Sequence, residues 1–286
     1  MASDSPCTEK SWLALAGAGI GPESMTVGLI ELARCADRVV VETYTLPGSD
    51  WVLEALAPLA GNRIERADRS VLEEGAARLV RDAMGRRVLV VAPGDPLIAT
   101  THRSILVTAS RLGVRTIVLP GVSGVCVAKA YAGLDYYKYG RTLTLPGPWR
   151  MVKPYSVLLG LAQNLCFGMH TLLLLDIDPA TGRQLEPCEG LRLLAGLEAE
   201  AGVSLLRDLE VLIVERAGLP GSRVSLARGL DGACGLPPVR APASVVVPGR
   251  LAPYEAEALE ALAGVSARGN QGLSSVACQI VEALSE

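Results

Sequence analysis

Short apolar runs that alternate with helix-like segments constrain the fold of this chain more than any other feature. Most runs end at Gly, Pro or an acidic residue and predict buried strands at residues 12–16, 39–41, 88–91, 116–119, 142–145, 171–175, 211–214 and 244–247. In the segments between most of these runs, apolar residues recur at helical intervals. This periodicity predicts helices over residues 25–35, 71–84, 104–112, 155–165, 191–201 and 255–262. Strand–helix alternation of this kind predicts an α/β protein with mainly parallel sheets.

The length of 286 residues allows two α/β lobes. A stretch rich in Pro and Gly, residues 145–154, follows a predicted strand and places the lobe boundary close by, near residue 142. We therefore expect an N-terminal lobe over residues 12–142, a C-terminal lobe over 143–286 and a flexible lead-in over 1–11. Residues 218–240, also rich in Gly and Pro, predict loops around one short helix.

Charge and apolar patterning argue against nucleic-acid and membrane partners. The net charge is −3, and no run of Lys or Arg makes a local basic patch. The longest apolar stretch, residues 157–175, is interrupted by Gln163, Asn164 and His170 and predicts a helix, a turn and a strand rather than a membrane span.

The seven cysteines form no C-x-x-C pair and their number is odd. We interpret them as small buried apolar residues in a reducing cytosol, which predicts a cytoplasmic protein without a metal site.

Gly or Pro turns follow several predicted strands, and in parallel α/β sheets ligands bind beyond the carboxyl ends of strands. The first such turn, residues 17–22 (GAGIGP), resembles a dinucleotide fingerprint, and Glu42 lies at a suitable distance along the chain for a ribose contact. Pro22, however, stands where that fingerprint needs Gly. By itself the turn is equally compatible with a ligand loop and a tight turn.

The second motif, residues 91–102 (VAPGDPLIATTH), runs from a buried strand into a rigid turn with one carboxylate, Asp95. Asp95 could accept hydrogen bonds from a ligand or offset its positive charge, or it could cap its own turn. The next helix is expected to begin after Thr100 or Thr101 as N-cap. His102 is interpreted as a loop or helix-start residue rather than a base.

A third cluster, residues 132–140, packs three tyrosines around a lysine and is compatible with surface or interface packing. His170 precedes a predicted strand and is interpreted as structural. Composition and motifs alone predict an α/β protein with a ligand site at strand ends.

Taken together, these segments resemble the diphthine synthase family of the tetrapyrrole methylase superfamily. The matching stretches occur in family order within residues 12–262, at residues 17–19, 25–27, 42–45, 93–102, 133–134, 137–140, 170–177, 216–218 and 247–249. Gly-Asp-Pro is shared by the whole superfamily, whereas its Ala-Thr-Thr-His continuation and the preceding Glu-x-Tyr-Thr are typical of diphthine synthases. Residues 263–286 lie beyond the matching part, and their role is left open.

The resemblance implies two α/β lobes with S-adenosyl-L-methionine in the cleft between them and S-adenosyl-L-homocysteine as product. It also implies a homodimer that successively methylates the amino group of the modified histidine of translation elongation factor 2, giving diphthine in diphthamide biosynthesis. The family's cofactor contacts correspond here to Ile20, Asp95, Ile98, Gly121, Val122, Leu175, Ala217 and Ala243.

Two of these positions depart from the family pattern. At residues 121–122 relatives show Ser before the apolar residue, so a hydroxyl contact is either lost or supplied by Ser123. Ala243 replaces a frequent His, which implies a main-chain contact or none. No catalytic residue is assigned, and the tyrosine cluster is only a candidate for a general base.

Three alternatives remain. A tetrapyrrole (precorrin-type) methyltransferase would share the fold and the Gly-Asp-Pro turn, but not the Ala-Thr-Thr-His continuation. An inactive protein would bind the cofactor and transfer nothing. A nicotinamide oxidoreductase is disfavoured by Pro22.

Overall fold

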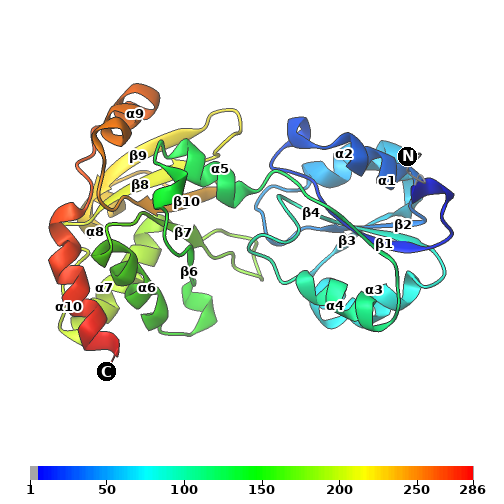
Figure 1. Cartoon of the computed structure of the whole chain (residues 1–286), viewed down its shortest axis with the longest axis horizontal. Coiled ribbons are helices and arrows are strands. Elements are labelled where there is room, and N and C mark those ends of the chain that lie inside the picture. The colour runs from blue at the N-terminus through cyan, green and yellow to red at the C-terminus, as the bar shows by residue number, and fades with distance from the viewer. Residues whose placement is uncertain (1–5, 286) are drawn as a thin grey trace. The chain divides into compact units, whose positions relative to one another are not determined.

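The computed structural model describes residues 6–285, and the chain divides into two compact units, residues 1–126 and 127–286 (Figure 1). Each unit contains one five-stranded sheet with helices, which confirms the predicted α/β class. The sequence placed the division near residue 142, whereas the structure divides within α5 (Gly124–Tyr131), a helix absent from the predicted elements.

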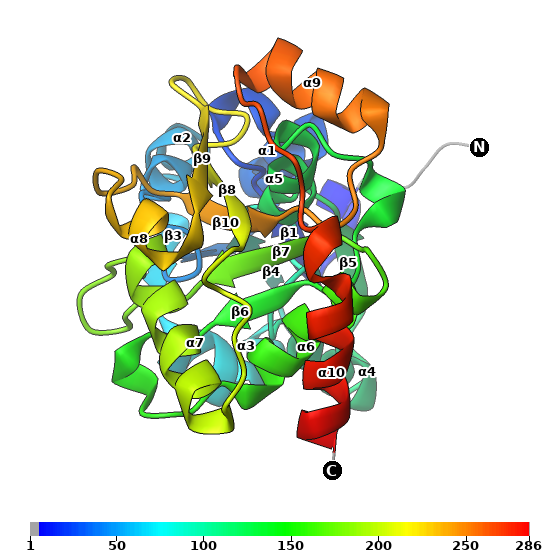
Figure 2. The same ribbon diagram turned by 90° about the vertical axis from the view of Figure 1, so that its left-hand side faces the viewer.

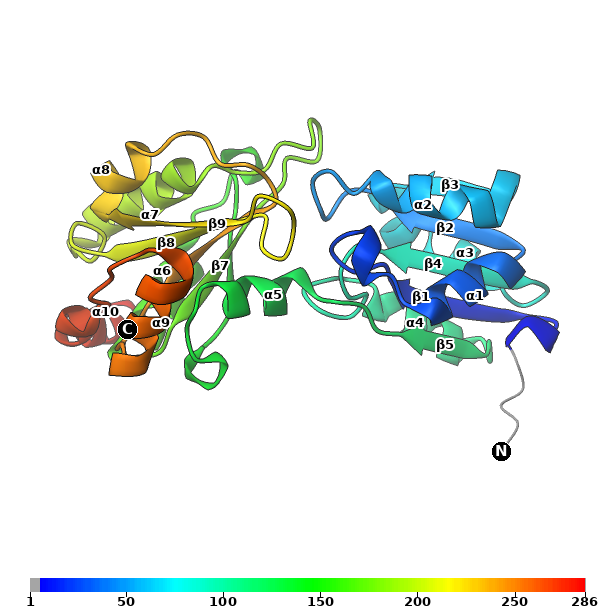
Figure 3. The same cartoon turned by 90° about the horizontal axis from the view of Figure 1, so that it is seen from above.

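The sheet of the first unit is entirely parallel, with the strand order β3-β2-β4-β1-β5 (Figure 3). Its strands are β1 (Trp12–Gly17), β2 (Arg38–Glu42), β3 (Ile64–Ala67), β4 (Arg87–Ala92) and β5 (Thr116–Leu119). Helices α1 (Val27–Cys35) and α2 (Trp51–Ala60) cover one face; α3 (Ala76–Asp82) and α4 (Arg103–Arg111) cover the other.

The two faces of β1 explain why its sequence is apolar throughout. Ala14 and Ala16 pack with α1 and α2, whereas Leu13 and Leu15 pack with α3 and α4. A strand buried on both faces has no polar alternation, as expected for a parallel sheet covered by two helix layers.

The sheet of the second unit has the order β6-β7-β10-β8-β9, and only β6 and β7 pair in parallel. Its strands are β6 (Leu143–Leu145), β7 (Thr171–Leu175), β8 (Glu210–Glu215), β9 (Arg223–Arg228) and β10 (Ala243–Val247). The mainly parallel pairing expected here is therefore not found. Strands β8 and β9 are joined by residues 216–222 without a crossover helix, which makes them antiparallel.

One apolar core of the second unit lies between the sheet and three helices, α6 (Tyr155–Cys166), α7 (Pro187–Ala201) and α10 (Ser274–Ser285). Figure 2 shows α6 beside α10. Helix α10 lies within residues 263–286, the segment whose role the sequence analysis left open. Ala277 and Ile280 of α10 are buried in this core, so the C-terminal segment closes it. Helices α8 (Gly229–Cys234) and α9 (Pro253–Ala263) complete the unit.

Several elements differ from the prediction. The helix predicted over residues 71–84 is divided at Gly75 into a π-turn, η4 (Ser70–Glu74), and α3. Helices α2, α5 and α10 and strands β3 and β9 were not among the predicted elements, whereas α8 is the short helix that the sequence predicted within residues 218–240. Short 3₁₀ turns are η1 (Pro6–Thr8), η2 (Pro22–Ser24), η3 (Gly61–Arg63), η5 (Tyr136–Lys138), η6 (Pro148–Arg150) and η7 (Gln271–Leu273).

Six of the seven cysteines form disulfides, so their interpretation as reduced apolar residues was wrong. The pairs are Cys7–Cys35, Cys166–Cys278 and Cys188–Cys234, with Cα–Cα distances of 5.2, 4.8 and 4.7 Å. The partners are separated by 28, 112 and 46 residues, and spacings of that length leave no local motif in a sequence.

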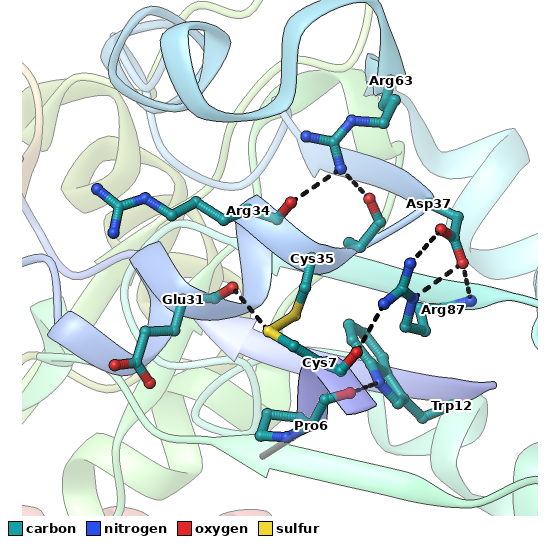
Figure 4. The surroundings of a disulfide bond; sticks show 10 residues. Pro6, Cys7, Trp12, Glu31, Arg34, Cys35, Asp37, Arg63 and Arg87 are labelled. Carbon is teal, nitrogen blue, oxygen red and sulfur yellow. Dashed lines mark hydrogen bonds and ion pairs between the residues drawn. A yellow bond between two sulfur atoms is a disulfide. The ribbon is translucent and has the colours of Figure 1, made fainter. Parts of the chain in front are cut away.

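The first disulfide fixes the beginning of the described chain (Figure 4). Residues 1–5 of the predicted lead-in lie outside the described residues, but η1 is joined to α1 through Cys7 and Cys35. Trp12 donates its indole hydrogen to the Pro6 carbonyl at 2.8 Å, and Arg87 donates to the Cys7 carbonyl at 3.0 Å. The lead-in is thus held in place from η1 onward.

Within residues 6–285 no helix is both long enough and apolar enough to cross a membrane. Over the same residues, no three His, Cys, Asp or Glu side chains gather as metal ligands would.

Candidate functional site

The carboxyl ends of β1, β4 and β5 meet at a group of glycines. A Cβ on Gly17 would lie 2.7 Å from the Cα of Gly121 and would also collide with the carbonyl oxygen of Gly94. Gly19 and Gly94 exchange main-chain hydrogen bonds of 3.1 and 2.8 Å. Only residues without side chains allow three strand ends to approach so closely. The turns that the sequence indicated therefore form one glycine cluster, Gly17, Gly19, Gly94 and Gly121.

The turn over residues 17–22 is closed by Ser24. Its Oγ accepts hydrogen bonds from the amides of Ile20 and Gly21, at 2.8 and 3.1 Å, and donates to the Gly21 carbonyl. These amides are therefore not directed at a pyrophosphate, and α1 begins only at Val27, after a Thr26 N-cap. A dinucleotide loop instead presents its amides at the start of the helix.

Asp95 belongs to the glycine cluster, and the structure confirms that it caps its own turn. Its Oδ1 accepts from the Leu97 amide at 2.9 Å, so it caps its own turn, and its Oδ2 accepts from the Gly121 amide at 3.1 Å. The second bond joins the turn after β4 to the turn after β5. A negative charge is thereby held at the strand ends by main-chain donors.

Three of the predicted contacts are apolar side chains of the turns that follow β1, β4 and β5. Ile20 lies beside Gly124, whose Cβ position is 3.8 Å from the Ile20 Cγ2. Ile98 and Val122 expose 40% and 41% of their surface. Ser123, the possible source of a hydroxyl, is buried. Ile20, Asp95, Ile98, Gly121 and Val122 thus all belong to the turns at the strand ends of the first unit.

The other three predicted contacts share one edge of the second sheet. Leu175 ends β7, Ala243 begins the antiparallel β10, and Ala217 follows the end of β8. Arg216, just before Ala217, has a φ of +50°, and its amide donates to the Pro242 carbonyl at 2.7 Å. Positive φ at a residue with a side chain is uncommon and often marks a functional turn.

Both main-chain polar groups of Ala243 are hydrogen-bonded to one side chain. The Gln184 side chain accepts from the Ala243 amide at 2.9 Å and donates to its carbonyl at 2.7 Å. A ligand would contact the Ala243 amide only by displacing Gln184, whereas the carbonyl oxygen keeps a second lone pair and the methyl group stays available.

Asp176, directly after Leu175, fastens the loop after β6. It accepts from the Gly147 amide, from the Trp149 indole at 2.8 Å and from two nitrogens of Arg150 at 2.8 and 2.9 Å. Burial opposes ionisation, yet these donors hold the pKa of Asp176 below its ordinary value. The loop beside the predicted contacts is therefore fixed by a charged carboxylate.

Two histidines that the sequence singled out are both buried next to glutamates. His102 is the N-cap residue of α4, where Thr100 or Thr101 was expected, and its Nε2 lies 3.3 Å from Glu42 Oε2. His170 Nε2 lies 2.8 Å from Glu255 Oε1. Neither pairing was predictable from the sequence, because the partners are distant along the chain.

The tyrosine cluster offers no evident base. Tyr139 is largely buried, burial raises its pKa, and its hydroxyl donates to the Lys129 carbonyl at 3.2 Å. Tyr137 is 94% exposed. Lys138 binds the Arg250 carbonyl and the Glu255 carboxylate. The cluster therefore anchors segments of the second unit to one another.

Comparisons with known proteins agree with this architecture. Residues 13–228 match the family described as tetrapyrrole (corrin/porphyrin) methylases. The chain is 40% identical to a diphthine synthase of Aeropyrum pernix, over 88% of this chain and 87% of that protein. It is 38% identical to a diphthine synthase of Pyrobaculum aerophilum, over 90% and 99% of the two chains.

A solved structure of a conserved hypothetical protein from Aeropyrum pernix K1 superposes with a TM-score of 0.86 at 37% identity, and the match covers 97% of each chain. The profile match, the full-length relatives and the shared fold lead to one assignment: this chain belongs to the tetrapyrrole methylase family, in its diphthine synthase branch.

Proposed function

We propose that this methyltransferase transfers methyl groups successively from S-adenosyl-L-methionine to the amino group of the modified histidine of elongation factor 2, giving diphthine. The observation that carries the proposal is the glycine cluster with Asp95, in a chain that matches diphthine synthases over nearly its whole length. The proposed contacts are the eight residues derived from the family, Ile20, Asp95, Ile98, Gly121, Val122, Leu175, Ala217 and Ala243.

The residues of the first unit fit this cofactor. S-adenosyl-L-methionine supplies a methyl group already activated by a sulfonium, so no protein nucleophile is needed. Gly17 and Gly121 let the strand ends pack closely around the turn that carries Asp95, and Asp95 provides a fixed negative charge for a cationic ligand. Exposed Ile98 and Val122 offer apolar surface of the kind that ligand sites use.

Catalysis would then consist mainly of holding donor and acceptor in line and excluding water. The small residues Ala217 and Ala243 leave room for an acceptor amine that grows with each methyl group. Because Gln184 accepts from the Ala243 amide, that residue would contact a ligand through its methyl group or its carbonyl oxygen.

One assay tests the proposal. The protein is incubated with S-adenosyl-L-methionine labelled in its methyl group, together with elongation factor 2 that carries the unmethylated precursor. We expect label on the factor, with mass spectrometry giving the number of methyl groups. Label on a porphyrinoid offered in the same assay would favour a tetrapyrrole methyltransferase, and no transfer to either would contradict both.

We further propose a cytoplasmic homodimer, the arrangement that the family resemblance implies for an enzyme acting on elongation factor 2. The three disulfides are compatible with an intracellular location, because intracellular proteins of hyperthermophiles are a recognised exception to the scarcity of disulfides there. Light scattering after gel filtration would measure the mass, and a monomeric mass would contradict the dimer.

A further inference from the structure

Glu42 and His102 form a buried acid–base pair that the proposed chemistry does not use. Glu42 ends β2 and His102 precedes α4, and their side chains are 0% and 1% exposed. The Oε1 atom of Glu42 accepts from the Thr45 amide at 2.8 Å and from the Thr45 hydroxyl. Its Oε2 atom faces the imidazole.

Unsatisfied polar atoms concentrate at this pair. Among the described residues, five buried side-chain nitrogens and oxygens lack a hydrogen-bond partner, and four of them belong to Glu42, Tyr44 and His102. Such atoms are rare in native proteins, and each needs an explanation. Burial raises the pKa of Glu42 and lowers that of His102, and a proton shared across the 3.3 Å between Oε2 and Nε2 would satisfy these two atoms together.

The pair lies at the far end of the loop that presents Asp95. The main chain of Pro96 acts on the His102 ring and counteracts the effect of burial on its pKa. The Thr100 hydroxyl donates to the Pro96 carbonyl at 2.6 Å, and Thr101 donates to Glu73 at 3.1 Å. The first bond folds the loop back toward its own beginning, and the second ties the end of the loop to η4.

The middle of the loop is also constrained. Leu97, whose amide binds Asp95, packs against the same core as Tyr44. Ala99 has a φ of +57°, a conformation that a residue with a side chain holds only when its surroundings enforce it. Tyr44 further packs beneath Arg69, and the carboxylate of Glu73 lies near its hydroxyl.

We propose that Glu42 and His102 are positioning residues that share a proton and clamp the end of the loop over residues 93–102, thereby holding Asp95 in place for the methyl donor. This inference rests on the proposed function for the identity of the donor. The clamp itself is a property of the first unit alone.

The experiment compares three variants with the unchanged protein. Glu42→Gln keeps the shape and removes the acidic proton, His102→Phe removes both ring nitrogens, and a third variant combines the two. Glu255→Gln is the matched control, because it alters an equally buried Glu–His pair in the other unit. Two quantities are measured: hydrogen exchange at single amides without ligand, and affinity for S-adenosyl-L-methionine by calorimetry.

In both single variants we expect exchange at the Leu97 and Gly121 amides, which bind Asp95, to quicken at least tenfold. The Leu15 amide, in the middle of β1, should keep its protection, because it opens only on global unfolding. Donor affinity should fall about tenfold in each single variant and no further in the double variant, since the two residues act as a unit. The control should leave the Leu97 and Gly121 amides and the donor affinity unchanged.

Unchanged exchange at Leu97 and Gly121 in folded Glu42→Gln would overturn the inference. So would faster exchange without loss of affinity, or losses that multiply in the double variant. If the unchanged protein binds no S-adenosyl-L-methionine but the variants still loosen these amides, the proposed function fails and the clamp stands. If His102→Phe does not fold, Glu42→Gln decides alone.

Discussion

The buried imidazole of His170 donates its Nε2 hydrogen to Glu255 Oε1 over 2.8 Å. The tautomer follows from the other ring nitrogen, because Nδ1 accepts from the Gly249 amide at 2.9 Å. Glu255 also accepts from the amides of Asp135 and Ala252, at 2.9 and 2.7 Å. One glutamate in α9 thus joins three of the segments through which the sequence resembles its family, those around residues 135, 170 and 249.

This arrangement predicts acid sensitivity of the second unit. Burial alone raises the pKa of Glu255, but hydrogen bonds from Ala252, Lys138 and Asp135 outweigh it and lower the pKa to about 2. A lowered pKa in the folded state means that the stabilisation is complete above about pH 4.5 and is lost as the pH falls toward 2. His170 acts in the same direction, since burial lowers its pKa and its protonation below about pH 6.5 favours unfolding.

We therefore expect Glu255→Gln to cost about 3 kcal/mol of unfolding free energy at pH 7 and much less at pH 3, as measured by urea denaturation. An equal cost at both pH values would contradict the role assigned to the charge of Glu255.

Replacement of Asp95 tests the donor site. Asp95→Ala removes the acceptor for the Leu97 and Gly121 amides and the fixed charge, and we expect affinity for S-adenosyl-L-methionine to fall tenfold or more in calorimetry. Asp178→Ala is the control, because Asp178 caps its own turn through the Ala180 amide in the same way, at 2.9 Å. Unchanged affinity in folded Asp95→Ala would remove Asp95 from the site.

The glycine cluster should tolerate no side chain. In Gly121→Ala the new Cβ would lie 2.8 Å from the Cα of Gly17 and would collide with the Gly94 carbonyl, so we expect a loss of about 1–3 kcal/mol. Gly85→Ala is the control, because its Cβ meets nothing within 4 Å. Thermal unfolding measures both variants, and equal melting temperatures would show that the strand ends can move apart.

The disulfides give a direct chemical prediction. Alkylation of the unfolded protein without reductant should label one cysteine, Cys126, and labelling after reduction should reach all seven. Mass spectrometry counts the labels, and seven without reduction would contradict the disulfides. Cys278→Ser opens the longest loop and should cost about 4 kcal/mol of stability, whereas Cys126→Ser should cost little.

The sequence predicted strands in both units correctly where their signals are local. The strands at residues 116–119 and 171–175 were predicted with their observed limits, since an apolar run bounded by a turn residue is visible without knowledge of its neighbours. The Gly-Asp-Pro turn was likewise recognisable from the sequence. Its glycine by itself indicates a backbone conformation or a close approach that a side chain would not allow.

The sequence could not show whether the strands of the second sheet pair in parallel or antiparallel. A buried strand such as β10 has the same apolar composition in parallel and antiparallel pairing, and its direction is set by the connections around it. The occupation of the Ala243 main chain by Gln184 also escaped prediction, since the two residues lie far apart in the chain.

By itself, then, the sequence determined the α/β class, the strand-end turns and the family. Only the tertiary structure decided which cysteines pair, that His102 and His170 each lie against a glutamate, and that Asp95 joins two turns. The reason is physical: periodicity and turn chemistry act over a few residues, whereas the partners of a buried charge or thiol are chosen by the packing of distant segments.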